Sequence, residues 1–162
     1  MPEEILDLVN EHDAVIGQLP RAEIYRRKLP NFRVVNAFIR DDQNRVWIPT
    51  RSANKTLYPL HLDVSVGGHV AAGEHYDEAL LREAEEEAAL ELTPQHVTRI
   101  AYLTPKDGVS AFMWLYEIRG VTPQLNPNDF VSAQWLSLEA LQHKVNTEPV
   151  KGDLPRLLEY LT

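Results

Sequence analysis

Residues 66–91 read VGGHVAAGEHYDEALLREAEEEAALE, a stretch in which an apolar strand pattern meets a glycine pair and then a long acidic helix pattern. Alternation over residues 62–66 predicts a short strand that runs into Gly67 and Gly68. From Tyr76 to about Glu91 the apolar residues recur at helical spacing, which predicts a helix with one buried face. The apolar stripe of this helix consists of Leu80, Leu81, Ala84 and Ala88.

The same helix carries a dense set of carboxylates. Residues 74–91 hold eight acidic residues and one basic residue, Arg82. Because residues three and four apart are neighbours on a helix, Glu83, Glu86 and Glu87 converge on one side, away from the apolar stripe. An isolated run of glutamates is more often a solvated face. Magnesium, however, prefers oxygen ligands, and three clustered carboxylates beside a glycine turn suit it.

The rest of the chain predicts strands and helices that interleave without strict alternation. Strands are expected over 5–9, 14–17, 32–39, 45–49, 96–103, 109–118 and 134–136, and helices over 22–27, 138–145 and 154–161. This order favours an α+β fold with a mixed sheet between helices. We interpret residues 1–162 as a single domain, in which residues 1–30 form an N-terminal extension that opens with a β-hairpin.

Composition excludes several classes of partner. The net charge of -8 argues against a nucleic-acid polymer or an anionic membrane, because both would repel the chain. No apolar run approaches the roughly 20 residues of a membrane span, and residues 1–4 do not resemble a secretory signal. Cysteine is absent, which removes disulfides and thiolate chemistry. These features predict a cytoplasmic protein.

The spacing of six residues carries a family resemblance. Gly68 is followed after five residues by Glu74 and, after seven more, by the run Arg82-Glu83-Ala84-Glu85-Glu86-Glu87. This pattern resembles the Nudix box, the signature of hydrolases that act on nucleoside diphosphates linked to another group. The resemblance implies the Nudix fold, an α/β/α sandwich. The family usually has glycine at the place of Ala89, which suggests that the helix here continues for a residue or two.

The resemblance also implies roles for the box residues. Glu83, Glu86 and Glu87 would bind Mg²⁺ (or Mn²⁺) with the carbonyl of Gly67, while Gly68, Glu74 and Arg82 would support the loop and helix. A carboxylate among the three glutamates would act as the general base, with Glu86 or Glu87 preferred. The family often adds a distal acid, for which Asp129 is the first candidate and Glu117 the second.

A second resemblance covers residues 5–87, which are similar to the isopentenyl-diphosphate isomerase branch of the superfamily. In that branch a catalytic cysteine occupies the place of Gly67, and His69 matches a metal-binding histidine. Glycine cannot protonate an alkene, so the isomerase scaffold is retained without its chemistry. Arg51 and Lys55 would still bind a diphosphate through their positive charges.

Together these features predict a Mg²⁺-dependent hydrolase that cleaves a diphosphate linkage in a nucleoside di- or triphosphate or a related derivative. The expected partner is a small phosphorylated substrate, and the N-terminal hairpin makes a homodimer conceivable. Two alternatives stay open: an isomerase-like enzyme, and a catalytically silent domain that binds a nucleotide diphosphate.

Overall fold

The computed structural model describes residues 3–162. A hairpin of β1 (Ile5–Val9) and β2 (Val15–Pro20) opens the chain and leads into helix α1 (Arg21–Arg26). The main sheet contains β3 (Arg33–Arg40), β4 (Val46–Arg51), β5 (Val66–His69), β6 (Val97–Leu103), β7 (Phe112–Arg119) and β8 (Phe130–Leu136). The remaining helices are α2 (Tyr76–Ala88), α3 (Leu138–Thr147) and α4 (Leu154–Leu158), with single 3-10 turns at Pro94–His96 and Pro105–Asp107.

The main sheet is mixed, as the sequence predicted. Its strand order is β6-β7-β3-β4-β8, with β3 and β7 parallel and the other neighbours antiparallel. One edge of β3 is shared by two partners. β5 pairs with β3 from Val34 to Ala37, whereas β4 meets β3 only at Arg40. The sheet therefore splits between β4 and β5.

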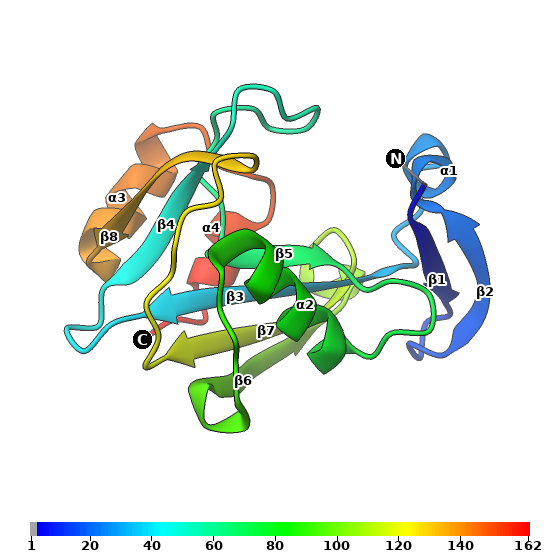
Figure 1. Cartoon of the computed structure of the whole chain (residues 1–162). Coiled ribbons are helices and arrows are strands. Elements are labelled where there is room, and N and C mark those ends of the chain that lie inside the picture. The colour runs from blue at the N-terminus through cyan, green and yellow to red at the C-terminus, as the bar shows by residue number, and fades with distance from the viewer. Residues whose placement is uncertain (1–2) are drawn as a thin grey trace.

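Helices cover both faces of this sheet (Figure 1). Successive strand residues point to opposite faces, so Tyr116 and Ile118 of β7 pack with α2 while Met113 and Leu115 pack with α3 and α4. The predicted α+β sandwich is confirmed. Within residues 3–162, no helix has the length and apolarity needed to cross a bilayer.

The N-terminal hairpin is tied to the body of the molecule at both ends. Leu6 and Ile24 are fully buried against Phe32 in a small core of their own. At the hairpin tip, the carboxylate of Asp13 accepts hydrogen bonds from the Nε of Arg33 at 2.7 Å and from the hydroxyls of Tyr76 and Tyr102 at 2.7 and 2.9 Å. These contacts fix the hairpin beside the start of α2.

Several boundaries differ from the prediction: β7 begins at Phe112 instead of 109, β8 begins at Phe130 instead of 134, and α4 ends at Leu158 instead of 161. Two further differences have a local cause. The strand expected over 62–66 begins only at Val66, because Asp63 and Ser65 bury their side chains in hydrogen bonds with Arg51 and with the carbonyl of Trp47 instead of alternating along a sheet.

The helix expected to reach about residue 91 ends at Ala88. Ala89 adopts the left-handed conformation, with φ 55° and ψ 41°. The expectation that alanine would prolong the helix was wrong: this position makes the left-handed exit even without glycine.

Candidate active site

The glycine pair allows helix α2 to approach strand β5 closely. A Cβ atom added at Gly68 would lie 2.3 Å from the carboxylate carbon of Glu83, which is closer than any real contact. Any larger residue at this position would therefore force the Glu83 carboxylate to move away from the strand. One residue earlier, the amide of Gly67 donates a hydrogen bond of 2.9 Å to Oε1 of Glu87. Two box glutamates thus meet the backbone of β5.

Arg82 holds the loop before α2 against the helix. Its guanidinium donates to both carboxylate oxygens of Glu74, at 2.8 and 2.9 Å, and to the carbonyl of His69 at 3.0 Å. The same group donates to Oε1 of Glu83 at 2.9 Å and lies 3.5 Å from Glu86. Arg82 therefore links the loop to two of the three predicted metal ligands.

Glu78 and Glu86 each lie four residues from Arg82 on the helix, and the structure separates the two. Glu78 accepts a hydrogen bond of 3.0 Å from the amide of His75 and closes the first turn of α2. Glu86, by contrast, faces Arg82 and is 57% exposed. Glu78 thus has a capping role, which leaves Glu86 as the side chain free to reach a ligand.

The electrostatics of this cluster favour a bound cation. Burial raises the pKa of Glu83 to about 7, although Arg82 opposes the shift. Burial, followed by the nearby charge of Glu83, also raises the pKa of Glu87. Hydrogen bonds from Arg82 lower the pKa of Glu74, so that residue stays ionised as a support. Two carboxylates that resist ionisation side by side would be relieved by a divalent cation.

The oxygen donors of Glu83, Glu86 and Glu87 are of the type that magnesium prefers, but their carboxylates point to different partners in this structure. Among residues 3–162 no three acidic or imidazole groups form a ready metal cluster. Glu83 is engaged by Arg82, and Glu87 by Gly67, whereas Glu86 extends into solvent. All available donors in the predicted set are oxygens, which a hard cation prefers.

The two candidates for the distal acid lie in different surroundings. Oδ1 of Asp129 accepts a hydrogen bond of 2.7 Å from Nζ of Lys55, so a predicted ligand and a predicted substrate contact meet each other. The loop before Asp129 reaches α2, where the side chain of Asn126 donates to the carbonyl of Glu86 at 2.8 Å. This contact favours Asp129 as the distal acid.

Glu117 is less favourably placed. It alternates with Tyr116 and Ile118, which pack toward α2, and it therefore projects from the opposite face of β7. Arg119 donates to its carboxylate, and Arg40 lies 3.6 Å away.

Arg51 is engaged inside the chain. Its Nη1 donates to Oδ2 of Asp63 at 2.9 Å, and its other nitrogens donate to the carbonyl of Leu57 at 3.0 and 3.1 Å. The side chain is only 12% exposed, so it braces the loop over residues 52–61. Arg51 could contact a substrate, as predicted, only if its hydrogen bonds to Asp63 and Leu57 were broken.

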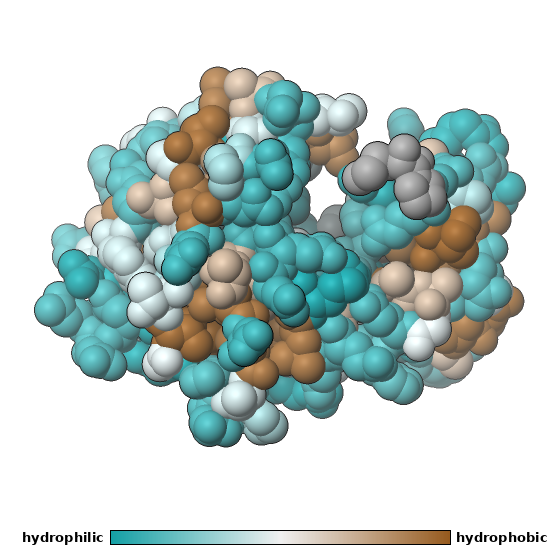
Figure 2. Space-filling model, viewed as in Figure 1, coloured by the Kyte–Doolittle hydropathy of each residue, from teal (hydrophilic) through white to brown (hydrophobic). Residues whose placement is uncertain are grey.

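A pocket of about 630 Å³ adjoins the cluster. Figure 2 shows the surface hollowed between the hairpin with α1 and the body of the molecule. Gly68 lines the pocket and packs against Glu83, so it connects the pocket with the predicted metal ligands. Asp63 and Lys151 also line it, 3.7 Å apart. Lys151 gave no sequence signal because it comes from a distant loop, whereas Asp63 could have been noticed as an acid among apolar residues.

Comparison with known families agrees with this geometry. The model of the NUDIX domain matches residues 30–158. The chain belongs to the Nudix family. The chain is thus a hydrolase that acts on pyrophosphate bonds, and the glycine pair, Arg82 and helix α2 lie within the matched residues.

Relatives share nearly the whole chain. An uncharacterized Nudix hydrolase of Nostoc is 51% identical over 159 residues, which cover 96% of this chain and 94% of that protein. The crystal structure of DR0079 from Deinococcus radiodurans is 44% identical and superposes with a TM-score of 0.90, covering 98% of this chain and 99% of that one. These Nudix relatives include the N-terminal hairpin, which precedes the matched domain.

An isopentenyl-diphosphate Delta-isomerase of Paenarthrobacter aurescens is more distant, at 27% identity over 169 residues, covering 96% of this chain and 91% of that protein. This similarity fits the resemblance of residues 5–87 to that branch. At Gly67, a Cβ atom would lie 2.7 Å from Oδ1 of Asn36 and 3.0 Å from Cγ2 of Val64. The position therefore has no room for a reactive side chain unless its neighbours move.

Proposed function

We propose that this Nudix hydrolase is Mg²⁺-dependent and cleaves a diphosphate linkage in a nucleoside di- or triphosphate or a related nucleoside diphosphate derivative. The observation that carries the proposal is the set of carboxylates on α2, in which Glu83 and Glu87 meet the backbone of β5 at the glycine pair and Glu86 lies beside Arg82. Manganese, which shares this preference for oxygen ligands, is the alternative cation.

In this proposal some residues of the chain hold the site in position, and others transfer a proton. Bound Mg²⁺ supplies neutralisation of the diphosphate oxygens and a lowered pKa for the attacking water. Arg82 fixes Glu83 and the preceding loop through four hydrogen bonds, and it lies 3.5 Å from Glu86. The amide of Gly67 engages one oxygen of Glu87 and leaves the other for a metal or a proton. Glu87, with its raised pKa, or the exposed Glu86 is the proposed base.

A substrate panel tests this proposal. The purified chain is incubated with nucleoside di- and triphosphates in the presence of Mg²⁺, and released phosphate and pyrophosphate are measured. We expect hydrolysis by the wild type and a large loss in Glu86→Gln and Glu87→Gln. Glu85→Gln is the matched control because Glu85 lies on the same helix and is exposed. Tight binding of a diphosphate with no release of phosphate would support the silent binding domain instead.

The isomerase alternative has its own test, since a distant relative carries that activity. Incubation with isopentenyl diphosphate and Mg²⁺ should yield no allylic diphosphate, because the chain lacks cysteine and has glycine at position 67. Conversion that depends on Mg²⁺ would overturn the hydrolase proposal.

A further inference from the structure

The C-terminal end of helix α2 is completed by a distant loop. The chain leaves the helix at Ala89 in the left-handed conformation, so the carbonyls of Glu86 and Ala88 need partners outside the helix. Nδ2 of Asn126 donates to the carbonyl of Glu86 at 2.8 Å, and the amide of Gln124 donates to that of Ala88 at 2.9 Å. The loop between β7 and β8 is thereby bonded to the part of α2 that carries the box glutamates.

Asn126 also shapes the turn that leads to Asp129. Its Oδ1 accepts a hydrogen bond from the amide of Asn128 at 3.0 Å, in a local turn that asparagine commonly forms. Its carbonyl accepts from the amides of Asp129 and Phe130, at 3.0 and 2.9 Å. The same half-buried residue therefore holds both the main chain of α2 and the main chain of the candidate distal acid.

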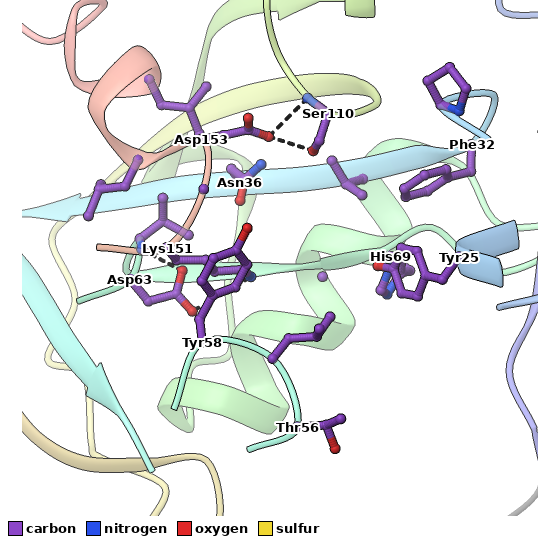
Figure 3. A pocket seen from close by; sticks show the side chains of 18 of the residues that line it. Tyr25, Phe32, Asn36, Thr56, Tyr58, Asp63, His69, Ser110, Lys151 and Asp153 are labelled. Atoms are coloured by element: carbon purple, nitrogen blue, oxygen red, sulfur yellow. Dashed lines mark hydrogen bonds and ion pairs between the residues drawn. The ribbon is translucent and has the colours of Figure 1, made fainter. Parts of the chain in front are cut away.

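Asp129 is held on its other side by the loop that follows β4. Its carbonyl accepts from the amide of Ser52 at 2.9 Å, and its carboxylate accepts from Nζ of Lys55 at 2.7 Å. Farther along this loop, Thr56 and Tyr58 line the pocket (Figure 3). Asp129 is thus bonded to a loop that forms one wall of the pocket, while its hydrogen-bonded connection to α2 passes through Asn126.

The requirements of a hard cation make this connection important. Mg²⁺ takes near-octahedral oxygen ligands at about 2.0–2.1 Å, so its ligands must be held at fixed separations. Glu86 and Glu87 are carried by a helix, which places ligands more precisely than the loop that carries Asp129. Hydrogen-bonding partners behind the ligands commonly supply the missing restraint.

We infer that Asn126 is a positioning residue of the metal site, which sets the separation of the Asp129 carboxylate from the carboxylates on α2. This inference rests on the proposed function, in which those carboxylates bind a divalent cation, and it takes Asp129 as the distal acid. A residue that only capped α2 would need its side-chain amide alone. Asn126 in addition shapes the turn before Asp129 with its Oδ1 and its carbonyl.

Titration of Mn²⁺, followed by the electron paramagnetic resonance of the free ion, tests the inference without turnover. Asn126→Ser removes the donor to Glu86 and keeps a hydroxyl that can accept from the amide of Asn128. Loss of one hydrogen bond predicts a rise of about fivefold in the Kd for Mn²⁺. Asn128→Ser is the matched control, because Asn128 is exposed and contributes a main-chain amide to the turn, and its Kd should match that of the wild type.

The same substitution in an Asp129→Asn background separates positioning from a purely structural role. Asp129→Asn should itself weaken Mn²⁺ binding, and Asn126→Ser should then add no further loss. Each titration is made at a temperature at which thermal unfolding shows all variants to be folded. An equal loss in both backgrounds, no loss in either, or unchanged Mn²⁺ binding by Asp129→Asn would overturn the inference.

Two outcomes separate this inference from the proposed function. If Glu86→Gln weakens Mn²⁺ binding but Asn126→Ser does not, the positioning role fails while the proposed function stands. If the Mn²⁺ titrations give the expected result but the substrate panel shows no hydrolysis, Asn126 positions a metal site and the proposed hydrolysis fails.

Discussion

At the scale of single residues, the absence of a side chain at Gly68 lets the Glu83 carboxylate lie against strand β5. We expect Gly68→Ala to displace the Glu83 carboxylate, because the new methyl group would lie 2.3 Å from its carbon. A displacement of this size at a catalytic group costs roughly 10²-fold in rate, measured as kcat/KM. Gly17→Ala is the control, since nothing lies within 4 Å of a Cβ atom at Gly17. Full activity of Gly68→Ala would show that the position of Glu83 is not important.

Ala89 stores strain at the end of α2. An L-residue in the left-handed region costs roughly 1–2 kcal/mol, and glycine relieves this cost while losing part of the gain to its greater freedom in the unfolded chain. We expect Ala89→Gly to raise the free energy of unfolding by about 1 kcal/mol in denaturant titration. Ala88→Gly, one residue earlier and inside the helix, should lower it. Destabilisation by both substitutions would contradict the observed helix end.

The residues of the box could be predicted from the sequence because their geometry is local. The spacing of Glu83, Glu86 and Glu87 on one helix fixes their proximity, and Arg82 was recognised as their support. The pairing of Lys55 with Asp129 could not be foreseen, since 74 positions separate them and only the fold brings them together. The same is true of Lys151, which no local pattern marks.

At the scale of elements, the carboxylate of Asp13 fixes the tip of the hairpin to the body of the molecule. We expect Asp13→Ala to lower the free energy of unfolding by about 2–3 kcal/mol, because it leaves three donors without their acceptor and places alanine at a positive φ. Denaturant titration would measure the loss, with Asp42→Ala on the exposed turn between β3 and β4 as control. Equal stability of the two variants would mean that the Asp13 contacts contribute little.

Element types were easier to predict than element boundaries. The amphipathic pattern of α2 and the apolar patterns of β3 and β7 are strong, and the structure confirms them. The strand prediction over 62–66 was wrong because Asp63 and Ser65 alternate with apolar residues as the polar face of a strand would. Both side chains are instead buried and held by tertiary hydrogen bonds. Periodicity cannot separate these two situations.

At the scale of the whole molecule, the carboxylate cluster couples metal binding to stability. The pKa of Glu83 is raised from 4.5 to about 7, and that of Glu87 is also raised. Between pH 4.5 and 7 these two carboxyl groups therefore bind more protons in the folded chain than in the unfolded chain, and they outweigh His69, whose pKa burial lowers to about 3. The metal-free protein should lose stability as the pH rises through this window, and Mg²⁺ should restore it above pH 7.

Thermal unfolding at pH 5.5 and pH 8, with and without Mg²⁺, measures this coupling. We expect a larger rise of Tm with Mg²⁺ at pH 8 than at pH 5.5, because ionised carboxylates bind the cation. Glu83→Gln should reduce both the pH dependence and the effect of Mg²⁺. A Tm that does not respond to Mg²⁺ at pH 8 would contradict a metal site in this cluster.

The most direct test of the central claim is Mg²⁺-dependent hydrolysis of the best nucleoside diphosphate by Glu87→Gln, compared with Glu85→Gln. The two residues lie two positions apart on α2, but only Glu87 contacts the backbone of β5. The proposed role predicts that Glu87→Gln loses roughly 10²- to 10⁴-fold in kcat, while Glu85→Gln stays within about twofold of the wild type. Equal activity of the two variants would contradict the assignment of this cluster as the catalytic centre.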